Sequence, residues 1–115
     1  MTDIYNQHDA AFRQVEAHVI VKDGERVATI AFKFPSDGAG RLYAYVHYIG
    51  LPMVRGFASG GGYDKRSAAC ADAARKIDRG PEDLPLLFAQ ALARDNGSTW
   101  DRALRDAGFT VWQAV

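Results

Sequence analysis

Hydrophobic and polar residues alternate with a period of two along three stretches in the first half of the chain. The stretches cover residues 15–21, 26–34 and 41–49, and this alternation predicts strands with one buried face. Asp23-Gly24 lies between the first two stretches and favours a tight hairpin, because both residues tolerate a positive φ. The pattern therefore predicts a three-stranded antiparallel meander.

The pattern changes after the third stretch, where Gly50-Leu51-Pro52 ends the alternation. Residues 53–63 then read as a loop, and the sequence leaves open a short extended piece at residues 53–57. Asp64 is expected to cap an alanine-rich helix that continues to about Ile77, since alanine strongly favours helix and aspartate is a good N-cap residue.

Two more helices and a final strand are predicted after Gly80. Pro81 stands in the first turn of one helix, and Gly108 terminates the other after a capping-box-like start at residues 98–101. Alternation returns at residues 109–115 and predicts a short strand. The apolar stripe of the middle helix has the spacing i, i+3, i+4, i+7 and i+8 and consists of Leu84, Leu87, Phe88, Ala91 and Leu92.

These elements predict an α+β fold in one domain of residues 1–115, with residues 1–14 as a mobile arm. The helices are expected to cover one face of the sheet. The buried face is predicted to consist of Val15, Ala17, Val19, Val21, Ile30, Phe32, Leu42, Ala44 and Val46. The opposite face is predicted to carry His18, Lys22, Lys33, Arg41, Tyr43, Tyr45 and His47, mixed with Val27, Ala31 and Ile49.

The tyrosines, histidines and cations of the opposite face leave three interpretations open. Cross-strand tyrosines stabilise a solvated sheet face, and aromatic residues are also enriched where a partner protein or a second copy binds. Rings beside cations can equally stack nucleic-acid bases.

Composition narrows the function classes. The 115 residues include 14 Lys+Arg and 14 Asp+Glu, and this balance disfavours indiscriminate nucleic-acid binding.

Cys70 is the one cysteine, so no disulfide or cysteine metal site forms within a chain, and a buried thiol is expected. The polar start predicts no signal peptide, and no apolar run is long enough for a membrane. We expect a cytoplasmic protein of a bacterium or of an element replicating in one.

A glycine-rich loop followed by two cations is the most unusual part of the chain. Residues 56–63 lead through Asp64 into Lys65-Arg66, and a helix start with adjacent cations favours an anion. The loop fits neither the G-x-x-x-x-G-K-[ST] pattern nor a G-x-G-x-x-G turn between strand and helix. A recognition site for phosphate or an acidic patch is therefore expected here, rather than a nucleotide cradle.

Residues 15–77 resemble a double-stranded-RNA-binding domain, in which three strands precede a helix that starts roughly G-x-G-x-S-K-K-x-A-K-x-x-A-A. The matching residues are Gly60, Gly62, Lys65, Arg66, Ala68 and Ala73, while Asp64, Ala69 and Asp72 depart from the pattern. The resemblance implies that Lys65 and Arg66 contact phosphates across a groove.

Catalytic and metal-binding patterns are not evident in the sequence. His8, His18 and His47 lack acidic or cysteine partners at ligand spacing, so no metal or other cofactor is expected. Glu16 and His18 are expected to point to opposite faces of their strand and hence not to form a catalytic pair.

The short chain without catalytic groups resembles the small proteins of phages and mobile elements, among them anti-CRISPR inhibitors of host defence. The resemblance implies a non-enzymatic protein that occupies the surface of a host protein or nucleoprotein complex, with no membrane partner. The alternative is a nucleic-acid-binding module, and a weaker third hypothesis is an enzyme with His47 and Lys65 in one pocket. The expected binding residues are Tyr43, Tyr45, His47, Arg55, Tyr63, Lys65 and Arg66.

Overall fold

The computed structural model describes residues 12–35, 41–59, 65–78, 83–94 and 99–113. Its strands are β1 (Phe12–Lys22), β2 (Glu25–Pro35), β3 (Leu42–Tyr48), β4 (Val54–Ala58) and β5 (Thr110–Gln113). Its helices are α1 (Lys65–Ala74), α2 (Asp83–Ala93) and α3 (Arg102–Asp106). The glycine-rich loop at residues 60–64, with Tyr63 and Asp64, and residues 1–11 of the predicted arm lie outside the described residues, whereas residues 12–14 of that arm belong to β1.

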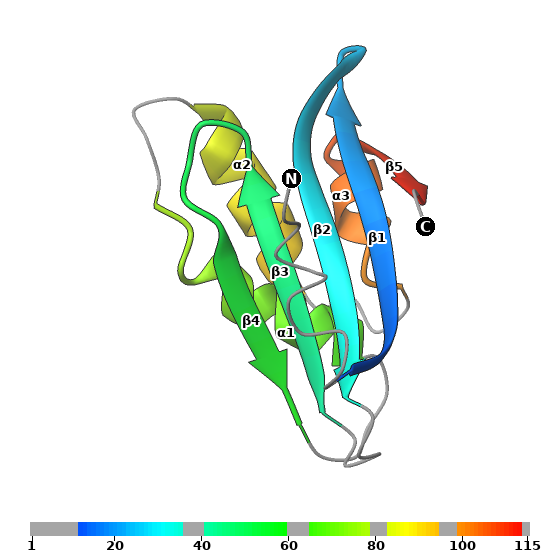
Figure 1. Cartoon of the computed structure of the whole chain (residues 1–115). Helices are drawn as coiled ribbons and strands as arrows, with labels where there is room; N and C mark the ends of the chain where they lie inside the picture. Colours follow the sequence, from blue (N-terminus) through cyan, green and yellow to red (C-terminus); the bar gives the residue numbers. More distant parts are fainter. Residues whose placement is uncertain (1–11, 36–40, 60–64, 79–82, 95–98, 114–115) are drawn as a thin grey trace.

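All strands pair antiparallel in one five-stranded sheet with the order β4-β3-β2-β1-β5. Figure 1 shows this sheet as one layer, with the three helices behind it. The predicted meander is confirmed, and so is the C-terminal strand, which pairs with β1. The strand count differs because residues 54–58, expected to be mainly loop, form β4 at the edge of the sheet.

The predicted hairpin between β1 and β2 is confirmed. Asp23 has a φ of 53° and Gly24 a φ of 80°, and Lys22 pairs with Glu25 directly across the turn. Two successive positive φ values are the signature of the turn whose twist matches that of paired strands.

A β-bulge lies one pair beyond this turn. Val21 pairs with Arg26, but Ile20 pairs with Ala28, so Val27 is an extra residue on β2. One extra residue reverses which side chains of β1 share a face with those of β2.

Because of this bulge, the predicted buried face of β1 is wrong. Without it, Val19 would face the helices together with Ala28 and Ile30. With it, Ile30 pairs with His18, and Phe32 pairs with Glu16, so the helix-covered face of β1 carries Glu16, His18 and Ile20. Three β1 residues that were expected on this face pair instead with outer-face residues of β2. They are Val15, Ala17 and Val19. For β2 and β3 the prediction is confirmed, since Ile30, Phe32, Leu42, Ala44 and Val46 all belong to the buried core.

The helices close the core from one side. Phe88 of α2 is fully buried, and its ring packs against Tyr48 at 5.2 Å and against Phe109 at 5.7 Å between centroids. Cys70 of α1 is also fully buried, as the sequence predicts. The alanines of α1 and α2 permit this close packing of helices on the sheet.

The end of α3 agrees with the sequence, whereas its start does not. Gly108 has a φ of 95°, its N–H donates to the Arg105 carbonyl at 3.0 Å, and the Phe109 N–H donates to the Leu104 carbonyl at 2.9 Å. This pair of bonds is the Schellman arrangement that glycine favours. The expected cap, Ser98, lies outside the described residues, and the helix begins only at Arg102. Asp101, directly before it, makes no side-chain capping bond, and its carboxylate binds Arg105 at 2.8 Å.

Among the described helices, none has the length and apolar character needed to cross a membrane.

Candidate functional site

The outer face of the sheet, opposite the helices, carries an exposed aromatic and cationic group at its β3–β4 end. Tyr43 pairs with Phe57 across the two strands, and their ring centroids are 5.0 Å apart. The guanidinium of Arg55 lies 5.2 Å from the centroid of the Tyr43 ring. Phe57 is 39% exposed, and Arg55 and His47 are exposed. We call Tyr43, His47, Arg55 and Phe57 the outer patch.

In the middle of the outer face, the side chains are buried. Tyr45 is only 4% exposed and Lys33 is fully buried, with the Lys33 ammonium 5.4 Å from the centroid of the Tyr45 ring. Tyr45 therefore exposes too little surface for a partner to contact. Of the tyrosines and histidines predicted for this face, only Tyr43 and His47 offer area to a partner, since His18 lies on the helix-covered face.

Lys65 and Arg66 lie elsewhere. Both begin α1, in the helix layer, whereas Tyr43 and His47 lie on the outer face. The predicted binding residues thus separate into two groups on opposite sides of the sheet. His47 and Lys65, which the enzyme hypothesis places in one pocket, are in different layers. Arg66 also points inward, as the contacts below show.

Arg66 forms a polar cluster with Glu16 and His18 of β1. It donates from Nε to Oε2 of Glu16 at 3.2 Å and from Nη2 to Oε1 at 3.0 Å. The Nε2 of His18 lies 2.8 Å from Oε2 of Glu16, and because a carboxylate only accepts, this nitrogen donates. We call Glu16, His18 and Arg66 the inner clamp, since it joins the start of α1 to β1.

Aromatic rings surround the inner clamp. The His18 ring meets Trp100 edge-on at 4.9 Å and Phe32 at 5.9 Å between centroids. The Arg66 guanidinium lies 5.1 Å from the Phe34 ring and 5.8 Å from the Phe32 ring. A planar cation between aromatic faces and a carboxylate is well stabilised. The clamp therefore has the charge pairing that buried ionic groups require.

The contacts of Glu16 favour its ionised form. Partial burial raises the pKa of Glu16, but the hydrogen bonds from Arg66 and His18 outweigh this effect and lower the pKa below its ordinary value of 4.5. A group with a lowered pKa is a poor proton acceptor at neutral pH. The geometry thus fits a structural ion pair better than an acid–base pair.

The inner clamp borders a shallow hollow of about 440 Å³. Its lining residues come from β1, α1, β5 and the start of α3 and are Glu16, His18, Arg66, Thr99, Trp100, Asp101 and Gln113. Burial raises the pKa of Asp101, but hydrogen bonds from Arg105 and Thr99 lower it overall. The carboxylates at this hollow are thus already hydrogen-bonded within the protein.

Sequence reasoning missed both the clamp and Phe57. The expectation that Glu16 and His18 point to opposite faces is wrong, because residues two apart in a strand share a face. The bulge then turns that face toward the helices. The sequence does not reveal Phe57, because residues 53–63 predict mainly a loop. In the structure Arg55 and Phe57 alternate with the small buried residues Gly56 and Ala58.

The described residues contain no group of three or more His, Cys, Asp or Glu side chains placed to hold a metal ion. In comparisons with known proteins, no family model, no curated protein and no solved structure matches this chain.

Proposed function

We propose that this protein acts by binding a partner protein through the outer patch. The observation that carries the proposal is the arrangement of Phe57, Tyr43 and Arg55, in which an exposed ring, a second ring tilted against it and a cation lie together on adjacent strands. Aromatic residues and arginine are the side chains that most often dominate binding energy at protein interfaces.

The patch is also preorganised. Tyr43 and Phe57 face each other across paired strands, so little side-chain freedom is lost when a partner covers them. The Phe57 backbone is held as well, since its N–H donates to Asp72 of α1 at 2.9 Å. A rigid aromatic group of this kind supports recognition by occupying a surface, which is how the small mobile-element inhibitors that this chain resembles in size and in its lack of catalytic groups are expected to act. The partner class we propose is a protein of a host defence complex.

The nucleic-acid alternative has less support. It relies on Lys65 and Arg66 as phosphate contacts, but the Arg66 guanidinium binds both oxygens of Glu16. The two cations and the exposed rings also lie on opposite sides of the sheet, so a single strand cannot stack on the tyrosines and follow both cations at once.

The test is affinity capture from host lysate, with and without nuclease, followed by mass spectrometry. We expect one partner that the wild type retains after nuclease treatment and that the double variant R55E/F57A loses. The matched control is R26E, which reverses an exposed arginine beside the β1–β2 turn. Circular dichroism of each variant checks folding.

Recovery of nucleic acid alone would contradict the proposal, and so would unchanged capture by R55E/F57A. Recovery of a second copy of the chain, lost in the same variant, would identify the outer patch as a homodimer interface instead.

A further inference from the structure

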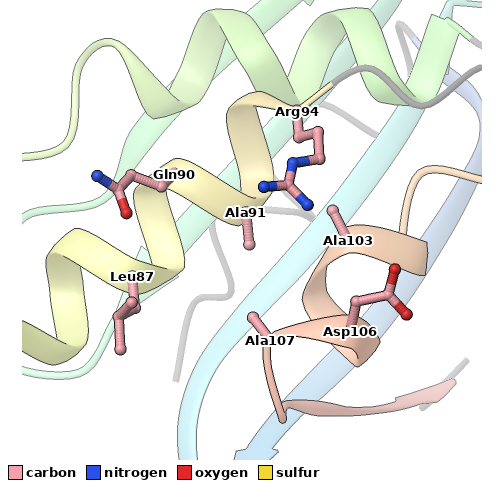
Figure 2. A pocket seen from close by; sticks show the side chains of 7 residues that line it. All are labelled: Leu87, Gln90, Ala91, Arg94, Ala103, Asp106 and Ala107. Atoms are coloured by element: carbon pink, nitrogen blue, oxygen red, sulfur yellow. The ribbon is translucent and has the colours of Figure 1, made fainter.

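A second surface lies in the helix layer, on the other side of the molecule from the outer patch. The hollow between α2 and α3 has a volume of about 220 Å³, and Figure 2 shows side chains from both helices around it. Its lining residues are Leu87, Gln90, Ala91, Arg94, Ala103, Asp106 and Ala107. This volume is below the roughly 300–1,000 Å³ of small-molecule sites and suits a few side-chain atoms.

The floor and one wall of the hollow are apolar. Ala91, Ala103 and Ala107 are small, so another helix can come close to both α2 and α3 here. Leu87 lines the hollow and is 46% exposed. An apolar side chain placed in the hollow would cover Leu87.

The rim carries two opposite charges, Arg94 directly after α2 and Asp106 at the end of α3. Figure 2 shows the two side chains on different helices, on either side of Ala103. In the part of the chain that the structure describes, neither charge takes part in an ion pair. Opposite charges around an apolar hollow favour a partner with the complementary pair, and they determine its orientation.

We propose that the α2–α3 hollow is the docking site of an amphipathic helix from a partner protein. The helix would place one large apolar side chain beside Leu87, an acidic residue at Arg94 and a basic residue at Asp106. A helix is the fitting occupant because the backbone groups of α2 and α3 are used within these helices, so an added strand would find few partners. The site is in a different layer from the outer patch, and this inference does not depend on the proposed function.

The test is selection from a phage-displayed library of helical peptides on the immobilised chain of residues 1–115. We expect enriched peptides with one large apolar residue and an acidic residue one turn away. Reversing the rim charge in R94E should weaken the best peptide roughly ten-fold. Changing the acidic residue of that peptide to lysine should restore its affinity for R94E.

Two controls make the outcome decisive. R102E reverses an exposed arginine of α3 outside the hollow and should leave the affinity unchanged, and R55E reports peptides that bind the outer patch. The proposal is overturned if no peptide family is enriched, if R94E binds as the wild type does, or if the charge-swapped peptide fails to recover affinity for a folded R94E. Leu87 is exposed, and a selection repeated on the L87D variant should no longer enrich this peptide family.

Discussion

At the scale of single residues, Gly56 determines how closely a helix approaches the sheet. A Cβ atom at this position would lie 1.9 Å from the Ala69 carbonyl oxygen and 2.5 Å from the Ala73 nitrogen. Both atoms belong to the backbone of α1, so a side chain could be accommodated only if the whole helix moved. The glycine is therefore required for lack of space and not for its φ angle.

We expect G56A to lower the free energy of unfolding by about 2 kcal/mol or more, because overpacking against backbone forces an element to shift. The comparison variant is G50A, since Gly50 has a φ of 90° but nothing within 4 Å of an added Cβ. It should lose only about 1 kcal/mol, from backbone strain. Urea denaturation of both variants measures the difference. Equal losses would argue against a direct contact of α1 with β4.

At the scale of elements, the bulge at Val27 decides what β1 contributes to each side of the sheet. It turns Glu16 and His18 toward the helices, where a lone carboxylate would be costly. Arg66 at the start of α1 offsets this cost. The bulge and the arginine are thus coupled, although 39 positions separate Val27 from Arg66 along the chain.

The inner clamp predicts a pH-dependent contribution to stability. The pKa of Glu16 in the fold lies below its ordinary value of 4.5, so its contribution is present above that value and is lost as the pH falls through the lower, folded pKa. E16Q should therefore be less stable than the wild type at pH 7, by about 2 kcal/mol, and the difference should shrink in acid.

The measurement is urea denaturation of both proteins across the range from neutral to acidic pH. E25Q is the control, because Glu25 is an exposed glutamate at the turn and should change stability little at any pH. If the free energies of unfolding of E16Q and the wild type differ by the same amount at every pH, the inner clamp is stabilised by packing and not by charge.

At the scale of the whole molecule, the two edges of the sheet differ. The edge at β4 is covered by α1, because Asp72 accepts from the Phe57 N–H and Lys76 donates to the Arg55 carbonyl at 2.8 Å. The backbone bond from Phe57 is also the main reason that the pKa of Asp72 is lowered. The edge at β5 has Trp112, which is 63% exposed. Covering a strand edge with polar side chains prevents pairing between molecules.

Removal of both covering side chains in D72A/K76A should promote self-association, because it frees the edge of β4. Light scattering after size-exclusion chromatography should show dimers or larger species that increase with concentration. R75A is the matched control, since Arg75 binds Asp72 at 2.7 Å but makes no bond to β4 that the structure describes. Monomeric D72A/K76A would show that the edge is protected by other means.

The sequence was sufficient for the parts of the fold that depend on local patterns. The β1–β2 turn, the strands up to β3 and the end of α3 follow from Asp23-Gly24, the period of two and Gly108. The bulge could not be predicted, because Val15, Ala17, Val19 and Val21 suit a buried face in either register. The inner clamp depends on that register, and therefore the sequence predicts an exposed Arg66 although its partner Glu16 faces the helices.

The order of the strands constrains when the fold can form. β1 is made first and acquires β2 through a two-residue turn, but its other neighbour is β5, some 90 positions later. Until residues 110–113 leave the ribosome, one side of β1 has no strand beside it, and Ile20 lacks the cover of Val111. Long-range pairing of this kind closes late. The nascent chain thus exposes an unfinished sheet until β5 emerges, and chaperones that bind apolar strands have that interval in which to act.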